Sequence, residues 1–194
     1  GSGKSTLIEC IAGLKELNGG TILYNGEQNV NLVRDSISTM MQKPYLFDKS
    51  VIDNIKIGLK FRKYASDKIT QRINKYIGCF DIEGLLYKNA RKLSGGESQK
   101  VALLRTAVLE TEMTLLDEPT SSMDIESTIS AENLIKDMSQ NGRSVIVVTH
   151  DYNQAKRIAD YVVFMDKGKI IEMGDKNKVL NNPENRLVKH VLNM

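Results

Sequence analysis

The chain opens with GSGKST at residues 1–6, which matches the last part of the phosphate-binding pattern GxxxxGK(S/T). In this pattern, glycines let backbone N–H groups surround phosphate oxygens, a lysine contacts the β- and γ-phosphates, and a hydroxyl completes a Mg²⁺ shell. Apolar residues at helical spacing follow, so we expect a helix directly after the loop, ending near Gly13. Since a helix N-terminus favours anions, this order predicts a nucleotide-binding fold. The first glycine of the pattern would lie upstream, and we therefore expect the chain to be N-terminally incomplete.

The second half of the chain alternates between helical and strand-like patterns, which is typical of a parallel sheet flanked by helices. The expected elements are a helix through Val101, Leu104 and Val108, a strand at 113–116, a helix at 125–138 and a strand at 144–148. Two further strands at 161–165 and 169–173 flank Lys167-Gly168 and predict a hairpin. We also expect a strand at 21–24 before an Asn25-Gly26 turn, and a last helix that starts at Asn182-Pro183 and ends at Met194.

Between these parts lies a charge-rich segment, about 48–93, with apolar residues at helical spacing. A length of 194 residues predicts one domain. We therefore expect a single α/β domain over 1–194, with a core at about 1–47 and 94–194, a helical subdomain at about 48–93, and N-terminal strands missing.

Composition excludes several classes of protein. A net charge of +3 without a basic run gives no support for nucleic acid as a partner. No stretch reaches the roughly 18 apolar residues that a membrane-spanning helix needs. Cys10 and Cys79 are isolated, and this favours buried thiols in a reducing cytoplasm over a metal site or a disulfide.

Two carboxylates follow the predicted strand at 113–116. The carboxyl ends of parallel strands face the ligand crevice of open α/β sheets, so Asp117 is placed to hold Mg²⁺ beside Ser5. Glu118 comes one residue later and is a candidate to polarise a water for attack on a γ-phosphate.

The segment LSGGE at 93–97 predicts a second phosphate-binding element. Ser94 and Glu97 fit a capping box at the start of a helix. Gly95 and Gly96 in the first helical turn cost about 1 kcal/mol each relative to alanine. Such glycines indicate close approach of the backbone to another group, and an exposed helix N-terminus is an anion site.

Two polar residues follow apolar segments elsewhere in the chain. His150 comes just after the predicted strand at 144–148, where it is a candidate hydrogen-bond donor to a γ-phosphate or to the attacking water. Gln42 follows Met40-Met41, and its amide oxygen is a candidate ligand for Mg²⁺ or water; a loop glutamine without such a role remains the alternative.

Read in order, GSGKST, Gln42, LSGGE, LLDEP from Leu115, Ser122-Met123-Asp124 and Thr149-His150-Asp151 resemble the motif series of ABC-type ATPases over the whole chain. The resemblance implies a P-loop NTPase with a RecA-like parallel sheet and a helical subdomain between the Q-loop and the signature motif. It also implies that ATP and Mg²⁺ are the cofactors. The implied sites are Walker A at Gly1, Ser2, Gly3, Lys4, Ser5 and Thr6, the Q-loop at Gln42, the signature at Ser94, Gly95, Gly96 and Glu97, Walker B at Asp117 and Glu118, the D-loop at Asp124 and the switch histidine at His150.

The resemblance further implies that two subunits close head to tail, so that Ser94, Gly95 and Gly96 of one chain cap the γ-phosphate held by Lys4 of the other. A homodimer of nucleotide-binding subunits on transmembrane permease subunits is expected, at the cytoplasmic face of the membrane. Membrane contact would then occur only through partners. The segment SVIDNIKIGL at 50–59 resembles importers, which implies uptake of a small solute such as an oxyanion or an amino acid.

The sequence leaves two alternatives. A non-transport ABC ATPase of DNA repair or translation shares the motifs, although the 50 residues between Gln42 and Leu93 leave no room for a long coiled coil. A GTPase or small-molecule kinase shares the phosphate loop, but it has no use for LSGGE. Some positions depart from the usual family pattern, among them Lys100, where arginine is common, and Thr114, which interrupts the apolar strand.

Overall fold

The protein is described by a computed structural model that covers residues 1–193. At residue 32 the description is limited to the backbone. The chain divides into two compact units. The first unit contains residues 1–21 together with the C-terminal part from residue 148, and the second contains residues 22–147.

A small sheet forms the centre of the second unit. Its strands β1 (Ile37–Met40), β2 (Met113–Asp117) and β3 (Ser144–Val148) lie in the order β1-β2-β3. Strands β1 and β2 are parallel, with Met40 opposite Leu116. The strand predicted at 144–148 is confirmed, and the one predicted at 113–116 extends by one residue to Asp117.

The polar residue within strand β2 is part of a buried cluster of three hydroxyl groups. Thr114 lies 3.2 Å from the Ser38 hydroxyl of β1 and 3.3 Å from the Thr111 hydroxyl, and Ser38 and Thr111 are 2.7 Å apart. Thr111 also donates to the Met113 carbonyl at 3.0 Å. Because buried hydroxyls are tolerated when they are hydrogen-bonded, the interruption of the apolar run is explained by cross-strand pairing.

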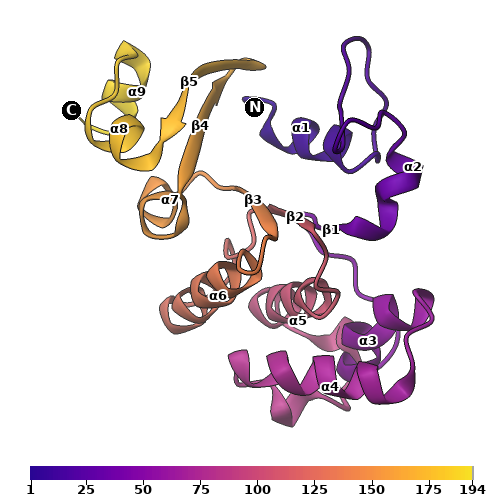
Figure 1. Cartoon of the computed structure of the whole chain (residues 1–194). Coiled ribbons are helices and arrows are strands. Elements are labelled where there is room, and N and C mark those ends of the chain that lie inside the picture. The colour runs from indigo at the N-terminus through magenta and orange to yellow at the C-terminus, as the bar shows by residue number, and fades with distance from the viewer. Residues whose placement is uncertain (194) are drawn as a thin grey trace. The chain divides into compact units, whose positions relative to one another are not determined.

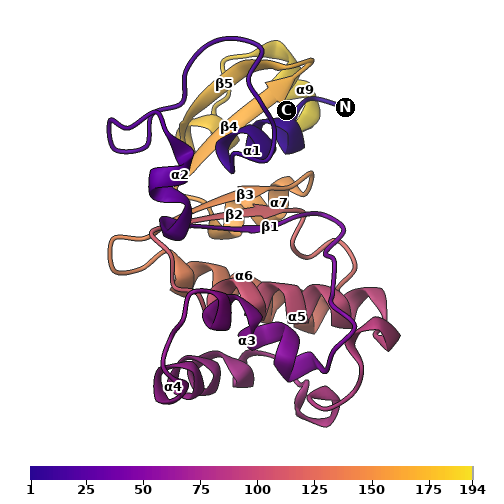
Figure 2. The same ribbon diagram turned by 90° about the vertical axis from the view of Figure 1, so that its right-hand side faces the viewer.

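Helices α5 (Gly95–Ala107) and α6 (Ile125–Met138) lie along one face of this sheet (Figures 1 and 2). Helix α5 buries an almost continuous set of apolar side chains, including Val101, Leu103 and Leu104, which are fully buried. Burial of this extent anchors the helix by the hydrophobic effect. Both predicted helices are confirmed, and the α6 range agrees to the residue.

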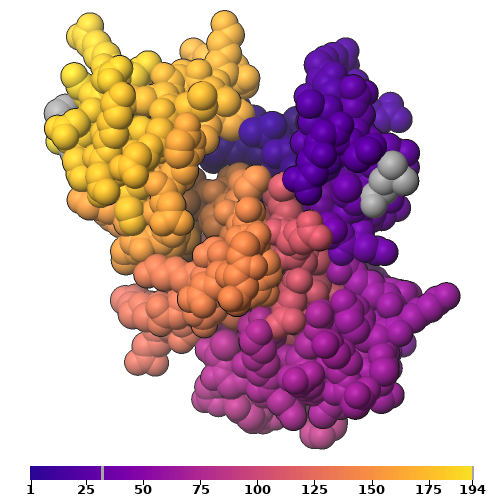
Figure 3. Space-filling model, in the orientation of Figure 1, coloured from indigo at the N-terminus to yellow at the C-terminus, as the bar shows by residue number. Residues whose placement is uncertain are grey.

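The charge-rich segment is helical, as predicted. Helices α3 (Val51–Phe61) and α4 (Ser66–Tyr76) are followed by short 3₁₀ turns at Ile77–Cys79, Glu83–Leu85 and Ala90–Lys92. Helix α3 packs on α5 and α4 packs on α3, and the side chains of the segment, magenta in Figure 3, form a continuous surface on the face shown. The subdomain boundaries at about 48 and 93 stay a prediction.

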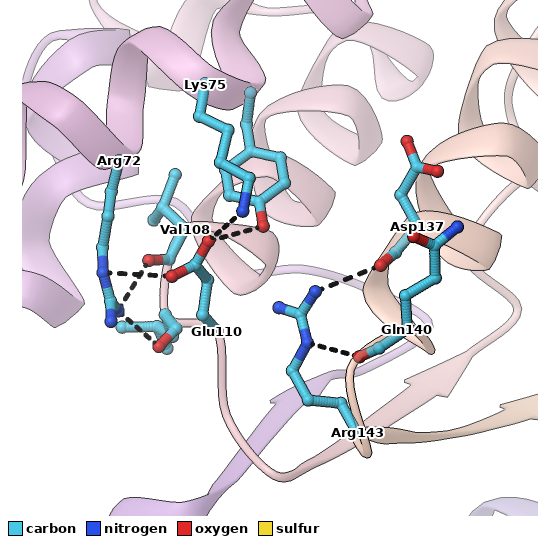
Figure 4. Close-up of polar contacts among 9 residues, drawn as sticks. Arg72, Lys75, Val108, Glu110, Asp137, Gln140 and Arg143 are labelled. Atoms are coloured by element: carbon cyan, nitrogen blue, oxygen red, sulfur yellow. Dashed lines mark hydrogen bonds and ion pairs between the residues drawn. The ribbon is translucent and has the colours of Figure 1, made fainter.

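Glu110 joins this helical segment to the loop before β2 (Figure 4). Its carboxylate accepts from Lys75 at 2.5 Å and from the Tyr76 hydroxyl at 2.8 Å, and it pairs with Arg72 at 3.4 Å. Arg72 also donates to the carbonyls of Val108 and Leu109. Burial alone would raise the pKa of Glu110, but its hydrogen bonds and neighbouring positive charges outweigh burial and lower the pKa.

The second unit also contains helix α2 (Val30–Val33) and a 3₁₀ turn at Arg34–Ser36. The first unit contains helix α1 (Lys4–Ile11), which confirms the helix predicted after the phosphate loop. It also contains α7 (Tyr152–Ile158), the antiparallel pair β4 (Tyr161–Asp166) and β5 (Lys169–Asp175), α8 (Lys176–Asn181) and α9 (Arg186–Val191). The predicted hairpin around Lys167-Gly168 is confirmed.

Two local predictions are wrong. Residues 21–24 form no strand, because Tyr24 and Glu27 close the Asn25-Gly26 turn through a single bridge that no further pairing extends among the described residues. The last helix begins after Asn185, not at Asn182-Pro183. Asn182 instead ends α8, and the Glu172 carboxylate accepts from the N–H groups of Glu184 and Asn185, which holds this segment outside a helix. The predicted end of the helix at Met194 lies outside the described residues.

Candidate functional site

The phosphate-loop residues lead into helix α1 with an open N-terminal end. Gly3 is the N-cap, in the left-handed region at φ 93°, where a glycine is favoured. No side chain of the described residues caps the helix, and its first turn holds no acidic residue. Lys4 donates to the Ser2 hydroxyl at 2.8 Å. The first turn therefore offers N–H groups and a lysine to an anion.

The hairpin turn of the same unit supports this loop. The Gly168 N–H donates to the Ser2 carbonyl at 3.0 Å. A Cβ placed on Gly3 would lie 3.5 Å from the Gly168 Cα. The sequence predicted the hairpin but contained no signal that its turn contacts the phosphate loop.

His150 also belongs to the first unit. It is exposed, and it follows the end of β3 at Val148. Its neighbours are fixed by hydrogen bonds, since the Asp151 N–H donates to the Thr149 hydroxyl and the Asp151 carboxylate caps helix α7. The backbone that carries the imidazole is thus held on both sides.

In the second unit, two of the predicted residues share the carboxyl edge of the sheet. Met40 and Leu116 are paired in parallel strands, and Gln42 and Glu118 each come two residues later. Gln42 is exposed, whereas Glu118 is partly buried. Glu118 has a backbone φ of 49°, a left-handed conformation that costs about 1 kcal/mol or more for a residue with a Cβ. Strain of this kind is concentrated at functional sites.

Asp117 is the last residue of β2, and only 2% of it is exposed. Its Oδ1 atom is buried without a hydrogen-bond partner among the described residues. A carboxylate oxygen in such surroundings is unfavourable unless a cation or a bound water accompanies it. The hard oxygen donor that Mg²⁺ prefers is therefore present at this strand end.

The signature residues form the N-terminal end of helix α5. The Ser94 hydroxyl accepts from the Glu97 N–H at 3.3 Å, and the Glu97 carboxylate accepts from the Ser94 N–H at 2.7 Å. The predicted capping box is confirmed. These hydrogen bonds lower the pKa of Glu97, and the one from the Ser94 N–H has the largest effect.

The helix end packs on the loop that follows β2. A Cβ added to Gly96 would lie only 2.8 Å from the Ser122 carbonyl oxygen, whereas one on Gly95 would make an ordinary contact. Gly96 thus permits close backbone approach, as the paired glycines indicated.

Asp124 caps helix α6 by accepting from the Ser127 N–H at 2.8 Å, and this hydrogen bond is the main reason that the pKa of Asp124 is lowered. Its other oxygen lies 3.9 Å from Lys100.

The predicted site residues therefore fall into two groups. Those in the first unit are Gly1, Ser2, Gly3, Lys4, Ser5, Thr6 and His150, and those in the second are Gln42, Ser94, Gly95, Gly96, Glu97, Asp117, Glu118 and Asp124. Within the second group, packing joins the signature end of α5 to the loop after β2. Sequence reasoning missed Gln99, whose Oε1 atom accepts from the Ser122 N–H at 2.8 Å at that junction. It named Ser122 only as part of the motif that ends at Asp124.

An open phosphate loop before a helix and a parallel sheet with acidic residues at a strand end define a P-loop NTPase of the α/β class. The solved structure of an ATP-binding subunit of an ABC transporter has the same fold, at a TM-score of 0.87 and 21% identity. That likeness covers 100% of this chain and 84% of the other.

The sequence narrows the class to a family. Residues 1–121 match the family model of the ABC transporter, and the chain belongs to this family. It is an ATP-binding subunit of the ABC type with ATPase activity. No helix among residues 1–193 is long and apolar enough to cross a bilayer.

Three relatives show how far the similarity extends. The phosphate import ATP-binding protein PstB of Thermotoga maritima is 33% identical over 99% of this chain and 82% of its own length. The spermidine/putrescine import ATP-binding protein PotA of Clostridium novyi is 33% identical over 97% and 55%. The phosphate import ATP-binding protein PstB 2 of Aliivibrio fischeri is 32% identical over 94% and 73%.

Proposed function

We propose that this subunit binds ATP with Mg²⁺ and hydrolyses it to drive import of a small solute through permease partners. The observation that carries the proposal is the buried Asp117 Oδ1, which lacks a hydrogen-bond partner among the described residues, at the end of strand β2. A cation beside this oxygen would remove its unfavourable burial. Asp117, Ser5 and Gln42 would hold Mg²⁺, which would neutralise charge on the β- and γ-phosphates.

The remaining residues act on the nucleotide and on the attacking water. The N–H groups of the loop from Gly1 to Thr6 bind phosphate oxygens, and Lys4 contacts the β- and γ-phosphates. Glu118 orients and deprotonates the water, and His150 donates a hydrogen bond to the γ-phosphate or to that water. The exposed position of His150 and the partly buried position of Glu118 are compatible with these roles.

A second copy of the chain would complete each site. In this arrangement Ser94, Gly95, Gly96 and Glu97 of one chain cap the nucleotide held by Lys4 of the other, with Asp124 at the dimer interface. The exposure of Ser94 and Gly95 at the start of α5 supports this role, since these groups remain available to a partner. We also propose one domain over 1–194 with a helical subdomain at about 48–93, and helices α3 and α4 within that range support the subdomain.

The names of the relatives support a proposal for the solute class. Two of the three relatives above are named for phosphate import and one for spermidine/putrescine import. We therefore favour an oxyanion over the amino acid that the sequence also suggested. We propose that transmembrane permease subunits are its partners and that the subunit lies peripherally at the cytoplasmic face of the membrane.

The test is Glu118→Gln in the complete protein. Turnover at saturating MgATP should fall at least about 100-fold, the range for loss of a general base, while an ATP-bound dimer accumulates in size-exclusion chromatography. Glu126→Gln is the matched control, because Glu126 is an exposed carboxylate in the first turn of α6. Unchanged turnover in Glu118→Gln would remove this glutamate from its assigned role.

A further inference from the structure

Gln99 lies on the buried side of helix α5 and directs all of its hydrogen bonds to one loop. It is 2% exposed. Its Nε2 group donates to the Ser121 hydroxyl at 2.8 Å and to the Glu118 carbonyl at 3.3 Å. Its Oε1 atom accepts from the Ser122 N–H at 2.8 Å. A primary amide has two N–H donors and one carbonyl oxygen, so both kinds of group are used on residues 118–122.

The loop that Gln99 holds has an unfavourable backbone conformation at its start. Glu118 is left-handed at φ 49° and is followed by Pro119. Such a conformation persists only when the surroundings fix it. The hydrogen bond from Gln99 to the Glu118 carbonyl is one such contact, and it acts on the same residue whose carboxylate is the proposed base.

The same stretch of α5 touches the loop at two further points. Gly96, three residues before Gln99, approaches the Ser122 carbonyl closely enough to leave no room for a Cβ. Lys100 lies 3.9 Å from the Asp124 carboxylate. The first turns of α5 and residues 118–124 are therefore joined by several contacts.

We propose that Gln99 is a positioning residue: it orients Glu118 to activate the water that attacks the chain's own nucleotide, and it transmits to Glu118 the state of the signature end of α5. This inference rests on the proposed function, in which Ser94 to Gly96 contact the nucleotide held by the partner. Gln99 would then couple the two nucleotide sites of a dimer, since it joins the group that senses one nucleotide to the group that hydrolyses the other.

The experiment compares three variants of α5 in the complete protein. Gln99→Met removes all three hydrogen bonds at similar volume, and Gln99→Glu keeps an acceptor but loses the donors. Thr106→Val is the control, because Thr106 is buried in the same helix and donates only to the Ala102 carbonyl. Turnover of MgATP, KM, the Hill coefficient for ATP and Tm are measured for each variant.

We expect both Gln99 variants to lower the turnover rate at saturation by about tenfold or more, because Glu118 would no longer be held where it activates the water; tenfold corresponds to about 1.4 kcal/mol of transition-state stabilisation. KM should stay within about twofold, and the Hill coefficient should fall toward one. Thr106→Val should lower Tm about as much as the Gln99 variants do, but it should leave turnover unchanged. If the Gln99 variants match Thr106→Val in turnover, the role of Gln99 is only structural and the proposal is overturned.

Two further variants make the outcome decisive. Gln99→Met should add nothing to the loss of turnover in a Glu118→Gln background, because the two residues act through one group. Fully additive losses would contradict the proposal.

If the Gln99 variants do not fold, Ser121→Ala is the alternative, because it removes one hydrogen-bond partner of Gln99. Turnover should then fall about threefold, and an unchanged rate would overturn the proposal. Unchanged turnover in Glu118→Gln alone would instead defeat the proposed function.

Discussion

Helices α1 and α5 both begin at glycine-rich segments, but among the described residues only α5 has side chains that cap the N–H groups of its first turn. At α1 the N-cap is Gly3, no described side chain caps the helix, and the first turn holds no acidic residue. At α5 the Ser94 hydroxyl and the Glu97 carboxylate form a reciprocal capping box. One helix end leaves its donors for a ligand, and the other satisfies part of them from its own sequence.

The difference indicates a division of roles. An uncapped end depends on an anion to satisfy its donors, so α1 suits the phosphates that a subunit holds for itself. A capped end is stable without a ligand, so α5 suits the proposed role of presenting Ser94 and the glycines to a nucleotide on another subunit. Four predictions test this comparison, from the largest expected effect to the smallest.

The first prediction concerns the open end of α1. Lys4→Met should weaken MgATP binding about 100-fold, because charge-assisted hydrogen bonds to phosphate worth about 3 kcal/mol are lost. Isothermal titration calorimetry on the complete protein measures the change. Lys15→Met, an exposed lysine beyond the helix, is the control and should bind normally. Equal affinities for the two variants would mean that the open end of α1 does not hold the nucleotide.

The second prediction separates the two glycines of α5. Gly96→Ala should destabilise the protein by about 2 kcal/mol, because its Cβ would overlap the Ser122 carbonyl oxygen at 2.8 Å. Gly95→Ala, which meets only the Ser122 side chain at 3.6 Å or more, should be neutral or stabilising by up to about 1 kcal/mol, since alanine favours helix. Urea unfolding of both variants gives the comparison. The packing argument fails if Gly95→Ala is the more damaging substitution.

The third prediction concerns the cap itself. Ser94→Ala should lower the free energy of unfolding by about 1 kcal/mol, the usual effect of removing an N-cap side chain. Ser66→Ala is a suitable control, because Ser66 is exposed in the first turn of α4 but caps nothing there. Thermal unfolding followed by circular dichroism should separate the two variants. Indistinguishable Tm values would show that the capping box adds no stability.

The fourth prediction is a pH dependence of less than about 1 kcal/mol. Hydrogen bonds at Ser94 hold the pKa of Glu97 below that of the unfolded chain, which is about 4.3. The stabilisation is therefore present above pH about 4.3 and is lost as the pH falls through the lower, folded-state pKa. Unfolding of the wild type and Glu97→Gln between about pH 6 and 3 should show the extra loss only in the wild type. Parallel curves for the two proteins would contradict this.

Local patterns predicted much of the fold. The helix at 125–138 and the strand at 144–148 agree to the residue, because helical periodicity and a β-branched run are properties of adjacent residues. The capping box at Ser94 was readable for the same reason. The strand expected at 21–24 is wrong, since a strand depends on a partner that local sequence does not specify.

The order and spacing of GSGKST, LSGGE and LLDEP predicted the family, which the family match confirms, and they indicated candidate residues for phosphate chemistry. This was possible because loops that bind phosphate need glycine, lysine and hydroxyl groups at fixed separations. Tertiary structure alone decided how Gln99 reaches residues 118–122, why Thr114 is tolerated in β2, and that Asp117 Oδ1 is buried without a partner among the described residues. These features depend on which distant segments pack together, and contacts across such separations in the chain leave no periodic signal in the sequence.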